Sequence, residues 1–296
     1  MSCLGKRFAH VTRYIRSLRG GSQPILAEAS DGEVYVVKFA DKIRGPNLLF
    51  NEVAGTELYR AFGLPVARWR PLLVTGDFLD ENPACWPRTP EGLHRPASGM
   101  CFGSLFLGGA SVKSFEVLPG SHFQRVRNHR DFWLAWLVDV CASHSDSRQA
   151  IFVEKESREL KAVFIDFGHM FGGPKGDQHP PGRASRYLDK RIYLRSTASS
   201  IVTVRRIAGN LDSDRLWRQL VSIPGEWQYE SAQANFAACL NRLSDSRLLE
   251  NTLDLLAESF GQNARERACS SFVRHPPVSI LSPGLQAKGR IRNAVA

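Results

Sequence analysis

Four charged residues and one glycine-rich turn carry the chemistry that this sequence could perform. They follow one another along the chain in the order Gly20-Gly21-Ser22, Lys38, Glu52, Asp146 and Asp166. A phosphoryl group in transfer spreads negative charge over its oxygens, so a cation must hold the phosphates and carboxylates must hold magnesium. Each signal is weak alone, but the whole set in this order is typical of phosphoryl transfer.

Each of these residue types fits one part of that reaction. Lys38 would hold the phosphates of the nucleotide, and Asp166 would hold magnesium. Glu52 would pair with Lys38 and fix its direction, because the lysine side chain is a flexible four-carbon stem. Asp146 would accept the proton of the attacking hydroxyl group.

Two strands and a turn must position the lysine. Residues 25–39 predict a strand, the hairpin turn Asp31-Gly32 and a second strand that contains Lys38. Upstream, the turn at residues 19–23 contains two glycines, which lack a Cβ and so let backbone N–H groups approach an anion closely. The same composition also fits a flexible connector, so the turn by itself does not establish a phosphate site.

A helix must position the glutamate. Residues 47–62 have helical periodicity, and Gly63 follows as a C-terminal cap. Glu52 lies off the apolar stripe of this helix, on a second face with Thr56 and Tyr59. A solvated acid would occupy the same place, so the pairing with Lys38 is a hypothesis that depends on the fold.

The remainder of the chain changes from β-rich to helical after residue 128. Asp146 falls in a polar loop, and Asp166 directly follows the second of two β-like runs. Residues 172–182, rich in Gly, Pro and His, fit no regular structure. The predicted elements are strands at 64–74, 100–107, 150–153 and 162–165 and helices at 132–141, 212–220 and 231–260, the last interrupted at an N-cap, Ser244-Asp245.

Length and composition bound the class of protein. With 296 residues, 43% hydrophobic and 23% charged, the chain can bury the core of one large or two small domains. The longest apolar stretch, residues 132–141, is too short for a bilayer and contains Asp139. No apolar segment follows the basic residues near the start, as a secretion signal would require. We therefore expect most of the chain to be ordered, with no collagen-like architecture, no membrane association and a cytoplasmic location.

Charge and cysteine spacing narrow the partners. The net charge of +10 predicts a surface that attracts anions. Six cysteines, at positions 3, 85, 101, 141, 239 and 269, form no close pair, so we expect buried thiols rather than a zinc or redox site. Basic residues concentrate at 183–206 and could contact nucleic acid or a phosphorylated substrate. No nucleic-acid motif accompanies them, so we expect no specific nucleic-acid binding.

Over residues 19–227 the sequence resembles the HipA-like kinases, bacterial relatives of the protein-kinase and lipid-kinase superfamily. The motifs that carry the resemblance are Gly20-Gly21-Ser22-Gln23-Pro24, Tyr35-Val36-Val37-Lys38-Phe39, Asn51-Glu52, Gly63-Leu64-Pro65-Val66, Phe102-Gly103-Ser104, Asp146-Ser147-Arg148-Gln149-Ala150-Ile151-Phe152, Ile165-Asp166-Phe167-Gly168-His169-Met170-Phe171-Gly172-Gly173-Pro174 and Ile223-Pro224-Gly225-Glu226-Trp227.

The resemblance implies an α+β, two-lobed protein-kinase-like fold, with a β-rich N-lobe at 1–127 and a mainly helical C-lobe at 128–262. Helical periodicity fades beyond Gly261, and the prolines and scattered basic residues that follow predict a disordered basic tail at 263–296. It implies ATP and magnesium in the cleft between the lobes, with Gly20, Gly21, Ser22 and Lys38 as nucleotide-binding residues. The implied reaction moves the γ-phosphate of ATP to a hydroxyl group, that of a protein serine or threonine. The implied partners are a protein substrate or an antitoxin-like protein.

One position departs from the kinase pattern. Such kinases place an asparagine five residues after the catalytic aspartate to bind a second magnesium ion, and here that position is Ile151. Gln149 is the candidate replacement, provided the loop is shorter, because an amide oxygen can coordinate a hard cation. The departure keeps open a second hypothesis, a pseudokinase that binds nucleotide and regulates a partner without turnover. His144 lies near the place of the catalytic-loop histidine, where a structural histidine fits equally well.

Overall fold

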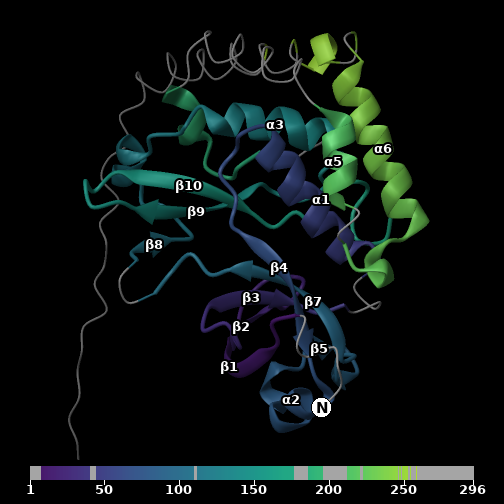
Figure 1. Cartoon of the computed structure of the whole chain (residues 1–296). Helices are drawn as coiled ribbons and strands as arrows, with labels where there is room; N and C mark the ends of the chain where they lie inside the picture. The colour runs from purple at the N-terminus through teal and green to yellow at the C-terminus, as the bar shows by residue number, and fades with distance from the viewer. Residues whose placement is uncertain are drawn as a thin grey trace, which may run out of the picture.

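The structure is a computed structural model of the chain. It describes residues 8–40, 45–109, 112–176, 186–195, 212–220 and 223–245, together with 247, 249–252, 254 and 258. The chain forms two bodies, one above the other in Figure 1. The lower body is built around one sheet, and in the upper body helices surround a smaller sheet.

The lower body is built on a five-stranded antiparallel sheet with strand order β1-β2-β3-β7-β4. The Asp31-Gly32 turn joins β2 to β3, and Gly32 has φ +80°, a conformation that glycine adopts without strain. In β3 the side chains of Tyr35 and Val37 are buried on one face, as strand alternation requires. The strands are β1 Val11–Ser17, β2 Ile25–Ala29, β3 Val34–Lys38, β4 Trp69–Val74 and β7 Gly99–Leu105.

Between β4 and β7 the chain forms a small insertion, residues 75–98, which the sequence pattern did not predict. It contains α2 Gly76–Glu81, a 3-10 turn at Pro83–Cys85 and the short pair β5 Arg88–Thr89 and β6 Gly92–Leu93. Its apolar side chains, Phe78, Leu79 and Cys85, are buried in the same core cluster as the sheet. The insertion is therefore part of the lower body (Figure 1).

Helix α1, Leu48–Ala61, connects the two bodies. Its side chains from Leu48 to Tyr59 are all buried, because the helix contacts β7 on one side and helices α5 and α6 on another. The predicted cap is present, since Gly63 has φ +73°. Burial on every side brings polar residues of this helix, including Glu52, into the interior.

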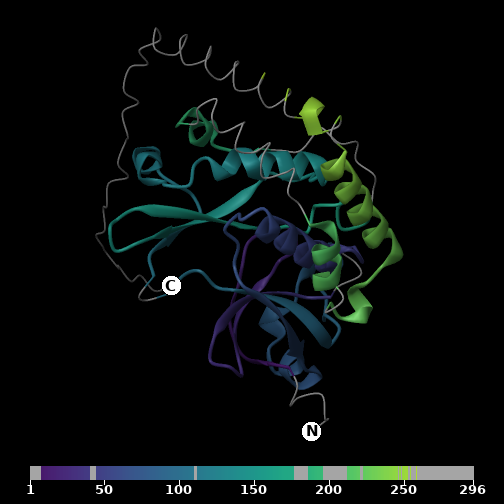
Figure 2. The same cartoon turned by 45° about the horizontal axis from the view of Figure 1, so that its top comes forward.

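In the part of the chain that the structure describes, the upper body combines a three-stranded sheet, order β10-β9-β8, with several helices (Figure 2). Aromatic rings of α3, β9 and β10 pack together in its core, with Phe132 stacked on Phe152 at 6.3 Å between ring centroids. The elements are β8 Ser114–Phe115, β9 Gln149–Glu154, β10 Leu160–Ile165, α3 Asp131–Cys141, α5 Ser213–Leu220 and α6 Glu230–Ser244.

Most expected elements are confirmed where the structure describes them. The strand–turn–strand at 25–39, the helix at 47–62, the buried helix at 132–141 and the hairpin before Asp166 are all present. Helix α6 ends at Ser244, and Asp245 then accepts a hydrogen bond from the N–H of Arg247 at 2.9 Å, as an N-cap would. The four cysteines that the structure describes, 85, 101, 141 and 239, are buried thiols.

Several predictions fall on other parts of the chain. Residues 177–182 of the Gly/Pro/His-rich stretch, most of the basic segment and the tail at 263–296 lie outside the described residues. The lobe boundary at residue 127 stays a prediction; β8, which precedes it, pairs with β9 of the upper body. Among the described helices, none is long and apolar enough to cross a membrane.

Candidate active site

Lys38, at the end of β3, lies between two carboxylates. Its Nζ donates to Oε1 of Glu52 at 2.5 Å and to Oδ1 of Asp166 at 2.8 Å, and the residue is only 6% exposed. Burial alone would lower the pKa of Lys38, but the two carboxylates outweigh it and raise this pKa above its ordinary value. The lysine is therefore a fixed cation in the interior, held from two directions.

Glu52 connects helix α1 to the loop after β10. Besides Lys38, its carboxylate accepts hydrogen bonds from the backbone N–H groups of Phe167 at 3.3 Å and Gly168 at 2.8 Å. Burial raises the pKa of Glu52, while Lys38 opposes that rise. The side chain is thus not the solvated acid that its place on the helix also allowed.

Asp166 follows β10 in a left-handed backbone conformation, with φ +63°. This conformation is unfavourable for a non-glycine residue, so its surroundings must stabilise it. Its Oδ2 accepts from Nε2 of Gln149 at 2.9 Å, and its backbone carbonyl accepts from the guanidinium of Arg148. Burial would raise the pKa of Asp166, but Lys38 lowers it below its ordinary value, so the carboxylate stays ionised.

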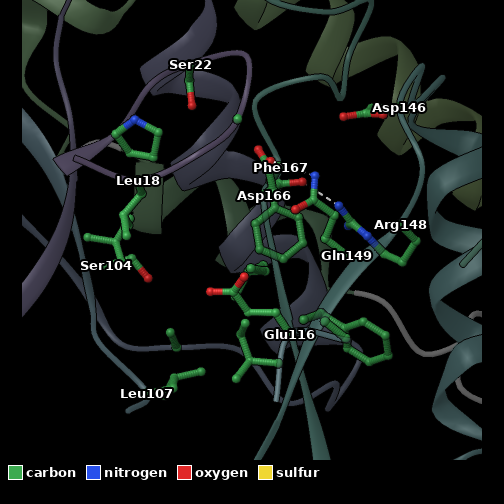
Figure 3. A pocket seen from close by; sticks show the side chains of 18 of the residues that line it. Leu18, Ser22, Ser104, Leu107, Glu116, Asp146, Arg148, Gln149, Asp166 and Phe167 are labelled. Atoms are coloured by element: carbon green, nitrogen blue, oxygen red, sulfur yellow. Dashed lines mark hydrogen bonds between the residues drawn. The ribbon is translucent and has the colours of Figure 1, made fainter. Parts of the chain in front are cut away.

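Asp146 lies in the loop between α3 and β9. The side chain is half-buried, and its Oδ1 accepts from the N–H of Ser147 at 2.6 Å. In Figure 3, Asp146 and Ser22 of the glycine-rich turn lie on opposite sides of the view, and Asp166 lies between them. A hydroxyl group bound next to Asp146 would therefore lie across the cleft from the turn.

One cleft of about 1640 Å³ brings the predicted residues together. It lies between the two bodies, with the glycine-rich turn on one side and the loops around Asp146 and Asp166 on the other. The predicted residues that line it are Gly20, Gly21, Ser22, Lys38, Glu52, Asp146, Gln149 and Asp166. Their roles in a reaction stay predictions.

Arg148 is buried next to Asp166, and the sequence motif that contains it did not indicate a role for it. The residue is 2% exposed, and its guanidinium stacks on the rings of Tyr59 at 5.2 Å and Phe167 at 4.7 Å. It also donates to the Tyr59 hydroxyl at 3.1 Å and lies 3.5 Å from Oδ1 of Asp139. Burial raises the pKa of Asp139 to about 6, although Arg148 and Tyr59 oppose this shift.

His144 belongs to this buried group rather than to the cleft lining. Its Nε2 is 3.3 Å from Nη2 of Arg148, and its Nδ1 is 4.0 Å from Asp139. Burial, reinforced by the charge of Arg148, places the pKa of His144 well below its ordinary value. The geometry fits the structural histidine of the two alternatives.

Asn51 is a second residue that the sequence motif contained but did not explain. Its Nδ2 donates to the carbonyl oxygens of Gly168 at 3.1 Å, Met170 at 2.8 Å and Gly173 at 3.1 Å. Together with Glu52, which accepts from N–H groups of the same loop, it fastens α1 to the loop after β10. Their adjacency in the sequence was the available signal, because neighbouring polar residues in a buried helix need partners.

Two arginines of the basic segment, residues 183–206, make contacts with other parts of the protein. The guanidinium of Arg186 stacks on Trp136 at 4.7 Å. Arg191 pairs with Asp189 and lies 4.8 Å from the ring of Phe123. These two arginines therefore make contacts within the protein, and the expectation of no specific nucleic-acid binding stays a prediction.

Comparison with known proteins identifies the fold. No protein-family model and no curated protein match this sequence. Among solved structures, the Helicobacter pylori proinflammatory kinase CtkA aligns with TM-score 0.51 and 13% identity, over 84% of this chain and 97% of that chain. The Golgi casein kinase aligns with TM-score 0.50 and 13% identity, over 86% and 75%. The fold is kinase-like.

This result confirms the two-lobed, α+β kinase-like architecture, with a β-sheet N-lobe and a helical C-terminal region. At such low identity the likeness concerns the fold. The more specific resemblance to HipA-like kinases stays a prediction from the sequence motifs.

A kinase-like fold raises the question of whether this cleft suits magnesium. The cleft offers hard oxygen donors, since Asp146 and the ionised Asp166 both line it and Gln149 touches Asp166. Within the described residues no group of three or more His, Cys, Asp or Glu gathers as a metal site. Magnesium commonly takes one or two carboxylates and completes its shell with water and substrate phosphates, so this sparse set fits it.

Ile151 and Gln149 occupy different places in this set. Strand β9 already begins at Gln149, so Ile151 lies within the strand, opposite Val163, and lines the cleft with an apolar side chain. The side-chain amide of Gln149 contacts Asp166, with 2.9 Å between its Nε2 and Oδ2 of Asp166. Rotation of its amide would present the oxygen toward a cation held by Asp166. The loop after Asp146 is thus short, which is the condition under which Gln149 can replace the missing asparagine.

Proposed function

We propose that this protein is an ATP-dependent phosphotransferase that moves the γ-phosphoryl group of ATP to a hydroxyl group, with serine or threonine of a protein as acceptor. One observation carries the proposal. Lys38 lies between Glu52 and Asp166 in a cleft that Asp146 and the glycine-rich turn also line. Phosphoryl transfer requires groups that position the reactants and stabilise the charge of the transferred phosphate. The cleft offers a lysine, two acids that fix it and a separate acid.

In this proposal each residue acts on a defined group. Lys38 Nζ and the backbone N–H groups of Gly20, Gly21 and Ser22 bind phosphate oxygens. Magnesium, when bound, neutralises charge on the transferred phosphate, and Asp166 with Gln149 would hold it. The carboxylate of Asp146 is half-buried and lines the cleft, where it accepts the proton of the acceptor hydroxyl.

The size of the cleft supports a large acceptor. Sites for single small molecules commonly enclose about 300–1,000 Å³. This cleft encloses about 1640 Å³, which leaves room for an acceptor chain beside a nucleotide. The HipA-like motifs support the same class of acceptor, a protein serine or threonine. A protein partner such as an antitoxin, and a cytoplasmic location, are predictions of the same origin.

The direct test is phosphoryl transfer by the purified chain with magnesium and radiolabelled ATP, to itself or to proteins of an extract. Asp146→Asn and Asp166→Asn should each lower the rate by about 10²–10⁴-fold, the usual range for a lost acid–base or charge-stabilising group. Glu159→Gln, which removes a surface carboxylate outside the cleft, is the matched control and should keep the wild-type rate. Equal transfer by Asp146→Asn and wild type would contradict the assignment.

The second candidate is a pseudokinase that binds nucleotide without turnover. The observation that favours it is the apolar side chain of Ile151 in the cleft, at the place where kinases hold a second magnesium ion. Thermal unfolding with and without ATP separates the cases, because ligand at 100 times its Kd stabilises a fold by about 2.7 kcal/mol. Stabilisation by ATP without transfer would favour the pseudokinase; no stabilisation would contradict both candidates.

A further inference from the structure

The glycine-rich turn is attached to the insertion at residues 75–98, far away in sequence. On the strand before the turn, the Tyr14 hydroxyl and the Ser17 hydroxyl both donate to the backbone carbonyl of Ala84, at 3.3 Å and 3.2 Å. The insertion therefore contacts β1 directly beneath the point where the chain leaves the sheet to form the turn.

Gln23 attaches the other side of the turn. Its side-chain Nε2 donates to the carbonyl of Arg88 at 2.9 Å, and the N–H of Arg88 donates to its Oε1 at 2.7 Å. One amide side chain thus pairs with both backbone groups of a residue in β5, as a neighbouring strand would. The backbone of Gln23 is left-handed, φ +40°, and its N–H donates to the Gly20 carbonyl at 3.1 Å, which closes the turn.

The insertion is a firm support for these contacts. Phe78 and Leu79 are buried in the core of the N-lobe sheet. Thr75 caps α2 by accepting from the N–H of Phe78 at 3.2 Å, and Asn82 donates to the Phe78 carbonyl at 2.8 Å. The Trp86 indole donates to the Leu79 carbonyl at 3.0 Å. A segment tied by buried side chains and by its own hydrogen bonds can hold another segment in place.

We propose that Gln23 is a positioning residue that holds the glycine-rich turn against the insertion in the conformation that binds the phosphates of the nucleotide. The inference rests on the proposed function for its ligand, and on the two hydrogen bonds to Arg88 for its geometry. A turn that populates its binding conformation only in part binds with an apparent Kd raised by the inverse of that fraction. Gln23 keeps this fraction high, so its effect falls on nucleotide affinity.

Two variants of Gln23 test the effect on affinity. Gln23→Ala removes both bonds and should raise the KM for ATP about tenfold with kcat within about twofold, since ordering the turn is a cost of binding and not of chemistry. Gln23→Glu keeps the acceptor for the Arg88 N–H but places a carboxylate oxygen against the Arg88 carbonyl, so it should also raise the KM for ATP. The KM for the acceptor should stay at its wild-type value in both variants.

Arg88→Ala is the matched control. It changes the exposed side chain of the same contact but keeps the backbone N–H and carbonyl that Gln23 binds, and Arg88 does not line the cleft. This variant should bind ATP as the wild type does. A rise of KM in Arg88→Ala equal to that in Gln23→Ala would overturn the inference, because the backbone pairing would then not be the cause.

Amide hydrogen exchange without nucleotide tests the geometry independently of any activity. In Gln23→Ala, exchange at residues 18–23 and at the Arg88 amide should become about tenfold faster, while the amides of β9 keep their rates. Unchanged exchange would overturn the inference, as would faster exchange with an unchanged KM for ATP. If the wild type neither binds nor turns over ATP while exchange still accelerates, the proposed function fails and the attachment of the turn stands.

Discussion

The two walls of the cleft are built in opposite ways. On the Asp166 side, buried groups from several elements hold the loop: Glu52 and Asn51 from α1, and Arg148 from the loop before β9. A Cβ added to Gly168 would clash with the Leu48 side chain. On the other side, Gly20 and Gly21 have open space around the place of a Cβ, and Ser17 and Gln23, which flank the turn, bind the insertion.

This difference separates two duties of a phosphotransferase. Charge stabilisation works best when the charged groups are fixed before the reaction, because reorganisation then costs nothing at the transition state. The Asp166 wall fits that requirement. In the proposed function the turn binds the nucleotide through backbone N–H groups. The nucleotide must also enter and leave the site, so an open surface suits the turn. Changes on the Asp166 wall should therefore affect stability and kcat, and changes on the turn should affect KM.

The largest expected effect is the loss of Arg148. Arg148→Met leaves the Asp139 carboxylate buried without its cation, and breaking a buried pair on one side costs about 3–5 kcal/mol. The Asp166 carbonyl also loses its donor, so kcat should fall with stability. Denaturant unfolding measures the first effect and single-turnover transfer the second.

The control is an ion pair on the surface. Arg127 contacts Glu159 while its side chain is 67% exposed. Arg127→Met should cost at most about 1 kcal/mol. The double variant Arg148→Met with Asp139→Asn should regain part of the loss, since it removes the uncompensated charge. Equal losses of stability in Arg148→Met and Arg127→Met would show that the buried contacts of Arg148 do not stabilise the Asp166 side of the cleft.

The sequence predicted the parts of this comparison that depend on periodicity and residue order. The strand that carries Lys38, the helix that carries Glu52 and the hairpin before Asp166 follow from local patterns, which act over a few residues. Order along the chain then suggested that these side chains meet. Their convergence in one cleft agrees with that suggestion.

The sequence could not predict what holds them there. Arg148, Asn51 and Gln23 all occur within sequence motifs. The partners of Gln23 and Asn51, however, lie 65 to 122 residues away along the chain. Such pairings depend on the tertiary fold and not on local periodicity. The insertion at 75–98 was missed for a related reason, because its helix and strands are too short to give a periodic signal.

The second expected effect is a pH dependence of stability from the same wall. The folded protein keeps His144 neutral, because burial and Arg148 lower its pKa, whereas the unfolded chain protonates this histidine below its ordinary value of 6.5. The unfolded state therefore binds the extra proton, and stability falls as pH drops below about 6.5, by about 1.4 kcal/mol per pH unit. His144→Gln should remove this slope.

Asp139 gives a slope of the opposite sign. Its pKa is raised to about 6 from an ordinary value of 3.8, so between these values the folded state holds a proton that the unfolded state has lost. Its contribution to stability is greatest below that window and is lost as pH rises through it. Urea unfolding of wild type and His144→Gln from pH 5 to 8 isolates the histidine as their difference, with His122→Gln as control. A difference independent of pH would contradict the assignment.

The smallest expected effect belongs to the open wall. Gly20 has φ +133°, which an L-residue adopts only with strain, while nothing lies within 4 Å of an added Cβ. Gly20→Ala should therefore cost about 1 kcal/mol in the turn and raise the KM for ATP about fivefold with kcat unchanged. Gly32→Ala is the matched control, because Gly32 also has positive φ, +80°, and open space, but lies in a hairpin outside the cleft. It should lose similar stability and keep the wild-type KM. A fall of kcat in Gly20→Ala would mean that the turn shares the chemical step with the Asp166 wall, and the division between the two walls would then be wrong.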